Sequence, residues 1–276
     1  MQCVNDKIFR LETRICPGKV RDENFNTISL DDEFQIYKNQ ISLFNDSLDL
    51  QEKFTFGIII EISKNENNND ITKAIQNSIE IKKKYPDLVC GIDICGDEDN
   101  NKSLQDLEKI MITKNDPDLP WILHCGESLK GKNYNLINAA ILNSKRFGHS
   151  INLFKMGTLY EYVKSKEITV ECCPISNQSM KQVRDLRLHP SIWYHNNGIK
   201  ICINNDNPTI YDTKGINYDF FVSCAAMEFD LLDMKSFGLN SIDGAEISNG
   251  LRNYYKIKFL KKWNEFIDYL ISKYDK

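Results

Sequence analysis

The feature that most constrains the fold is a regular alternation of short apolar runs with helical stretches along a chain of 276 residues. The runs have lengths typical of strands, and the stretches between them carry apolar residues at helical spacing. The seven runs cover residues 7–15, 54–62, 88–96, 120–128, 146–153, 168–176 and 199–206. Repeated strand and helix units of this kind predict a parallel sheet.

The spacing and composition of the runs indicate how the sheet is built. From Asp93 onward, successive strand ends lie 31, 25, 24 and 33 residues apart, which suits repeated βα units. The runs are continuously apolar, so we expect both faces of the strands to be covered. The chain has the length of one α/β barrel, and no linker divides it. We therefore expect one barrel domain over 1–276, helical from about residue 219, with the polar segment 65–70 in a loop.

Charge and hydropathy exclude two classes of partner. The formal net charge is −4, and the lysine-rich segments fall at helical positions where solvated faces are expected, so we expect no nucleic-acid partner. No apolar run approaches the roughly 20 residues needed to span a bilayer, so we expect no membrane partner. The first residues also lack the apolar centre of a signal peptide. A small or neutral substrate fits this composition better than a polyanion.

Nine cysteines are present, and most of them lie within or at the ends of the apolar runs. Their spacings match no common zinc-binding pattern, so we expect small buried thiols rather than a metal knuckle. The six in the runs are Cys90, Cys95, Cys125, Cys172, Cys173 and Cys202.

Polar side chains collect where the predicted strands end. They are Asp93, Asp97, Glu98, His124, Glu127, His149, Ser176, Asn177 and Asp206. In an α/β barrel the carboxyl ends of the strands converge on one mouth, so these residues can meet. Taken by itself, His124 is as well explained as a structural histidine of the core as it is as a functional residue. Two histidines, a glutamate and an aspartate at four separate strand ends instead predict a metal-assisted hydrolytic site. His189 and His195 lie outside these runs, after the segment DLRL, and we expect both at the surface.

Five segments carry a family resemblance. In this order and spacing, GIDICGDE, LHCGE, RFGHS, ECCPISN and INNDNP resemble the adenosine deaminase family of metal-dependent amidohydrolases. The resemblance runs from about Ile8 to the C-terminus. KGINYDFF and KIKFLKKWNEFIDYL are most similar to the adenosine deaminase-related growth factor branch, the secreted second type of animal adenosine deaminase.

The resemblance implies a (β/α)8 barrel of the TIM type that binds one Zn²⁺ and converts adenosine, or a related purine nucleoside, and water to inosine and ammonia. It assigns His124 and Asp206 as metal ligands, and Asp206 also as the acceptor of the proton from the attacking water. Glu127 corresponds to the proton donor to N1 of the purine. His149 corresponds to the histidine that orients the hydroxide, and Gly96 to a backbone donor to the purine ring.

Two further positions are assigned to substrate binding. The first is Asp93, which lies in the same segment as Gly96. Asn207 replaces an aspartate that contacts N7 of the purine in the family, and an asparagine amide can still donate a hydrogen bond to that nitrogen. Ser150 stands where the family usually has glycine, which would place a side chain close to the mouth.

The family's first strand carries a His-x-His pair that supplies two metal ligands, and this chain has no such pair. FRLETR resembles the family's second strand, so the chain is expected to begin one βα unit late and to leave the edges of 7–15 and 199–206 unpaired. Only two side chains that would bind the metal directly remain, which predicts weak or absent zinc binding by this chain. The alternative interpretation is an inactive or truncated relative that binds a nucleoside or a protein partner. A homo-oligomer is possible, and a complete form that follows the resembled branch would be extracellular.

Overall fold

The computed structural model describes residues 2–48, 54–131 and 134–274, and it confirms an α/β fold with parallel strands. Each of the seven predicted runs contains one strand. The strands are β1 (Arg10–Ile15), β2 (Thr55–Ser63), β3 (Val89–Cys95), β4 (Leu123–Cys125), β5 (Arg146–His149), β6 (Thr169–Cys172) and β7 (Ile201–Ile203). Several are shorter than their apolar runs, because the polar residues at the ends form turns toward the following helix.

The strands form one curved wall. Strands β1, β2 and β3 pair in that order, as do β4, β5, β6 and β7, and every pair is parallel. A parallel bridge between Ile92 and Trp121 joins the two sheets. Among the described residues β1 pairs only with β2, and β7 only with β6. The structure is therefore a barrel wall with an opening between β1 and β7.

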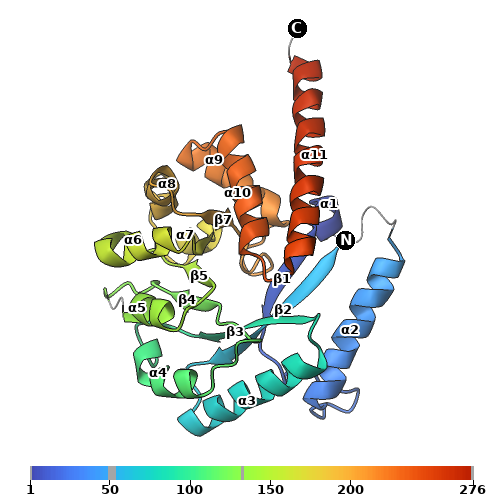
Figure 1. Cartoon of the computed structure of the whole chain (residues 1–276), viewed down its shortest axis with the longest axis vertical. Coiled ribbons are helices and arrows are strands. Elements are labelled where there is room, and N and C mark those ends of the chain that lie inside the picture. The colour runs from blue at the N-terminus through green and yellow to red at the C-terminus, as the bar shows by residue number, and fades with distance from the viewer. Residues whose placement is uncertain (1, 49–53, 132–133, 275–276) are drawn as a thin grey trace.

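Helices surround the wall on its outer side (Figure 1). They are α1 (Gln2–Asn5), α2 (Leu30–Asp46), α3 (Asn68–Lys84), α4 (Leu104–Thr113), α5 (Tyr134–Ile141), α6 (Gly157–Ser165), α7 (Pro174–Ser179), α8 (Pro190–Asn196), α9 (Ile216–Met227), α10 (Leu231–Gly244) and α11 (Asn249–Tyr274), with 3-10 turns at Leu153–Lys155 and Leu186–Leu188. Three of them, α9, α10 and α11, make up the described part of the chain after Gly215. None of the described helices is long and apolar enough to cross a membrane.

The prediction of a loop at 65–70 is partly wrong. Asn68 to Asp70 form the first turn of α3, because the Asn67 side chain accepts the backbone N–H of Asp70 and caps the helix. A similar cap begins α4, where Ser103 and Asp106 form a reciprocal capping box.

The core confirms that both faces of the strands are covered. One large cluster packs strand residues such as Ile58, Ile92 and Val170 against the helices, and a smaller one lies on the inner side of the wall. All nine cysteines are free thiols. Of the six that were expected to be buried, five are, and Cys95 is half-buried.

The C-terminal helices partly cover the opening in the wall. Helix α10 packs against β7 and β6, and the Asn240 amide donates to the Ile201 carbonyl over 3.0 Å. The segment that follows α10 reaches β1, since the Glu246 N–H donates to Glu12 Oε1 at 3.0 Å. Arg146 Nη1 on β5 donates to the Gly244 carbonyl at 2.8 Å. Polar contacts from one segment therefore link the two sides of the opening.

Candidate active site

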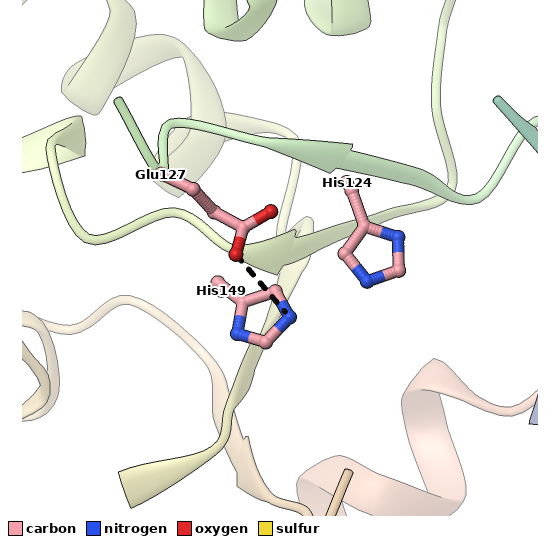
Figure 2. Close-up of side chains that lie close together, drawn as sticks. All are labelled: His124, Glu127 and His149. Atoms are coloured by element: carbon pink, nitrogen blue, oxygen red, sulfur yellow. Dashed lines mark ion pairs between the residues drawn. The ribbon is translucent and has the colours of Figure 1, made fainter. Parts of the chain in front are cut away.

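Three side chains meet at the carboxyl ends of β4 and β5. His124 lies on β4, Glu127 follows it in the next turn, and His149 ends β5 (Figure 2). The two imidazole centroids are 5.0 Å apart, and His149 Nε2 lies 3.8 Å from Glu127 Oε1. One potential ligand atom from each residue lies within 4.8 Å of the other two. Within the part of the chain that the structure describes, this is the one group of three such residues close enough to hold a metal ion.

The turn at Gly126 brings Glu127 back toward His124. Gly126 has a φ of +82°, and a Cβ there would lie 2.9 Å from the Leu136 side chain, so glycine is required by both conformation and space. The buried Glu98 carboxylate accepts the backbone N–H groups of Gly126, Glu127 and Ser128 at 2.9 to 3.1 Å. Glu98 thus anchors the turn that carries Glu127, a role that its position at a strand end did not reveal.

His124 is held by a carboxylate behind it. Asp93 Oδ2 lies 2.5 Å from His124 Nδ1, and Asp93 Oδ1 accepts the His124 backbone N–H at 3.1 Å. Arg14 Nε donates to the same Asp93 carboxylate at 2.7 Å. The Asp93 side chain is fully buried. It therefore lies behind His124, and the Nε2 atom of His124 is left to face the group.

The buried charges shift the pKa values of Asp93 and His124 in opposite directions. Burial alone would raise the pKa of Asp93, but His124 and Arg14 hold it well below its usual value. Burial alone would lower the pKa of His124, but the Asp93 carboxylate raises it. A carboxylate bonded to the far nitrogen of a histidine is the arrangement that orients histidine ligands in zinc sites. The donor set at His124 therefore fits a metal.

Glu127 is surrounded by groups that stabilise its charged form. Burial alone would raise its pKa, but the charges of His149 and His124 lower it, and Gln182 Nε2 donates to Glu127 Oε1 at 2.9 Å. Without a bound ligand Glu127 is therefore a carboxylate, and it must take up a proton before it can donate one. Burial lowers the pKa of His149, although the Glu127 carboxylate opposes the shift.

The backbone turns sharply after β5. His149 and Ser150 have φ angles of 56° and 50°, a left-handed conformation uncommon for residues other than glycine. The Ser150 side chain is fully buried and donates to the Cys125 carbonyl at 3.1 Å. This bond holds the two turns after β4 and β5 against each other.

Asp206 and Asn207 follow β7 and lie outside the close group of His124, Glu127 and His149. The Asp206 carboxylate accepts hydrogen bonds from Ser176 Oγ at 2.6 Å and from Asn207 Nδ2 at 2.8 Å. It is still near enough to His149 for its charge to raise the pKa of that ring against the effect of burial. Both residues are exposed, so they face the open side of the site.

Gly96 directly follows β3 and has a φ of +138°, and it lies beside Lys64, which directly follows β2. Lys64 is fully buried, and its Nζ has no hydrogen-bond partner among the residues described. Burial raises the pKa of Glu98, and the charge of Lys64 opposes that shift. At Glu127 the charge of Lys64 adds to the lowering of the pKa by the two histidines. Lys64 was missed in the sequence, because a lysine at the start of a polar segment looks like a solvated residue.

The expectation that His189 lies at the surface is wrong. Only 2% of His189 is exposed, because its ring caps α8 and bonds to side chains beneath the site. His195 is half-buried and lies 2.6 Å from Asp233 on α10, in a cluster with Phe229 and Phe237. Neither position follows the periodicity that marks core residues in helices, so the pattern carried no sign of their burial.

The model of the family described as Adenosine deaminase matches residues 19–256. Adenosine deaminase 2 of Dictyostelium discoideum is 30% identical over 99% of this chain and 51% of its own length. Adenosine deaminase 2 of Homo sapiens is 35% identical over 71% of this chain and 40% of its own length. The chain thus spans about half the length of the curated relatives that it matches.

Solved structures support the fold. An adenine deaminase from Arthrobacter aurescens superposes with a TM-score of 0.79 at 16% identity, covering 97% of this chain and 76% of that chain. An amidohydrolase with bound zinc from Burkholderia ambifaria gives a TM-score of 0.84 at 16% identity, covering 98% and 72%. At such low identity these structures show the barrel architecture and nothing about substrate.

Proposed function

Since the chain belongs to the adenosine deaminase family, and its relatives of the second type confirm the branch that its sequence resembles, we propose that it deaminates adenosine or a related purine nucleoside. The reaction takes water and releases ammonia. The bond from C6 of the purine to the amino nitrogen breaks, a bond from C6 to the water oxygen forms, and inosine is the product.

The observation that carries this proposal is the convergence of His124, Glu127 and His149 on one point. His124 faces that point with the nitrogen that Asp93 does not occupy, so it can hold a metal ion. Glu127 supplies a carboxyl group for proton transfer. An imidazole that can bind a metal, a carboxyl group and a second imidazole in one place suit the hydrolysis of a ring amine.

We assign Zn²⁺ to His124 and Asp206. Zinc, when bound, lowers the pKa of a water molecule to about 7 and so supplies the nucleophile at neutral pH. Asp206 accepts a proton from the attacking water, and His149 holds that water in place. Asp93 acts through His124, by fixing the ring that faces the metal.

The purine would be held from three sides. Glu127, once it has taken up a proton, protonates N1, which makes C6 more electrophilic. The Gly96 backbone N–H donates to the ring, and the Asn207 amide donates to N7.

Zinc binding by the chain alone is expected to be weak. Two of the expected protein ligands are in this chain, and structural or catalytic zinc normally has three or four. Losing half of the ligands removes most of the binding free energy. Elemental analysis of dialysed protein should find well under one zinc per molecule, and a stoichiometric content would refute this prediction.

The function is tested by incubating the chain with adenosine and excess zinc and measuring inosine and ammonia. Equal amounts of both products are expected, and His124→Ala should abolish them together with zinc binding. His195→Ala is the matched control, because it removes a histidine outside the site. A folded chain supplied with zinc that binds adenosine without releasing ammonia would overturn the proposal and support a non-catalytic relative.

A further inference from the structure

A buried line of polar side chains runs from α8 to the candidate site. The Ser191 backbone N–H donates to His189 Nδ1 at 3.1 Å, and His189 Nε2 lies 3.1 Å from Asn177 Oδ1. Asn177 Nδ2 lies 3.0 Å from His149 Nδ1 and donates to Gln182 Oε1 at 2.8 Å. Gln182 in turn donates to Glu127. We propose that His189 and Asn177 are positioning residues, which fix the tautomer of His149 so that its Nε2–H points into the site.

The direction of each bond follows from the Ser191 end of the line. A backbone N–H can only donate, so His189 Nδ1 carries a lone pair and the proton of the neutral ring is on Nε2. That Nε2–H must donate to an oxygen, which identifies the atom of Asn177 facing it as Oδ1. The Asn177 NH₂ group therefore faces His149 Nδ1, which must accept. In the neutral ring of His149 the proton is then on Nε2.

The other end of the line gives the same answer independently. The Glu127 carboxylate can only accept, so Gln182 faces it with its NH₂ group and turns its oxygen toward Asn177. Asn177 must then present NH₂ on that side, as the Ser191 end also requires. Asn177 is fully buried, and so is Ser191, so water does not compete for these bonds. Burial also lowers the pKa of His189 to about 4, which keeps its ring neutral.

The two histidines of the site are therefore held in complementary states. The Asp93 carboxylate accepts a hydrogen bond from Nδ1–H of His124, so the neutral ring has its lone pair on Nε2. The Asn177 amide donates a hydrogen bond to the lone pair on Nδ1 of His149, so the neutral ring has its proton on Nε2. His124 can bind a metal, whereas His149 can only donate a hydrogen bond, even though both belong to the same close group. The catalytic consequence, that His149 holds the attacking water by donation, rests on the proposed function.

The test is ¹⁵N NMR of the chain labelled with ¹⁵N at its histidines. The spectra are recorded with a chelator present and adenosine absent, at a pH where His149 and His189 are neutral. There are four histidines, so single substitutions assign them. In the parent, both rings should show a bare Nδ1 and a protonated Nε2. A protonated Nδ1 at His149 in the folded parent overturns the proposal without any variant.

The Asn177→Asp variant replaces the hydrogen-bond donor that faces His149 by an acceptor, with a side chain of nearly the same shape. A carboxylate can only accept, so His149 should move its proton to Nδ1 and show a bare Nε2. Ser191→Ala is the matched control, because it removes the hydroxyl 2.7 Å from His189 Nδ1 and keeps the backbone N–H, so both tautomers should stay. An unchanged His149 in folded Asn177→Asp, or a switched one in Ser191→Ala, overturns the proposal. These signals are read without substrate. If the chain shows the predicted tautomers but makes no inosine, the proposed function is refuted and the inference about the tautomers stands.

Discussion

Buried charges at four positions tie the inner side of the wall together. Arg146 pairs with Glu12 and with Glu171, both at 2.7 Å, and Arg14 pairs with Glu171 at 2.9 Å. Burial alone would raise the pKa of Glu171, but Arg14 and Arg146 lower it from 4.5 to about 2. Since Arg14 also bonds to Asp93, this network supports the residue behind His124.

We predict that Glu171→Gln lowers the free energy of unfolding at neutral pH by about 3–5 kcal/mol, because it leaves two buried arginines short of a partner. The pKa of Glu171 is lower in the folded state, so its stabilisation is present above pH 4.5 and is lost as pH falls toward 2. The variant should therefore lose less stability than the parent across that range. Denaturant unfolding at several pH values measures both effects.

Glu167→Gln is the control for this prediction. Glu167 pairs with Lys200 at 3.3 Å in an exposed ion pair, which contributes at most about 1 kcal/mol. Equal losses in the two variants, or an unchanged acid dependence in Glu171→Gln, would show that the network does not stabilise the fold.

At the residue scale, the sequence predicted which side chains meet in the site, but not which residues hold them in position. His124, Glu127 and His149 follow strand ends, and the rule that parallel strands end on one side was enough to bring them together. Their supports come from elsewhere in the chain: Arg14 is 79 residues from Asp93. His189 was misplaced because one residue before a proline carries no periodic signal. Side-chain direction at such positions depends on packing that only the folded chain defines.

At the element scale, strands were predictable because continuous apolar runs with regular spacing have few other interpretations. Helix α3 began earlier than expected, because a capping asparagine within a polar segment resembles a loop. The place of α10 could not be predicted from its own pattern. It packs against β7, where the wall has no further strand among the described residues, and this contact depends on the opening itself.

We predict that Phe237→Ala lowers the free energy of unfolding by about 3–5 kcal/mol, since loss of this fully buried side chain of α10 leaves a cavity beside His195 and Phe229. Leu232→Ala on the same helix should cost far less, because 70% of Leu232 is exposed. Chemical denaturation of both variants measures the difference. Similar small losses in the two would mean that α10 does not seal the wall.

At the scale of the whole molecule, the opening between β1 and β7 leaves backbone groups without strand partners among the described residues, and such edges recruit other chains. Helix α11 also extends away from the body (Figure 1). Several of its apolar side chains are exposed. Ile257 is 70% exposed and Tyr274 is 69% exposed. We predict self-association that increases with concentration. Sedimentation velocity tests this prediction, and a monodisperse, stable monomer across concentrations would contradict it.

The central claim is that this site deaminates a purine by acid assistance from Glu127, and its most direct test is the rate of inosine formation by Glu127→Gln supplied with zinc. Glutamine can still bond to N1 but cannot deliver a proton, so turnover should fall at least about 10²-fold while zinc content and adenosine affinity stay close to the parent's. A Glu127→Gln chain that binds as much zinc as the parent under the same zinc supply, and forms inosine at nearly the parent's rate, would contradict the claim.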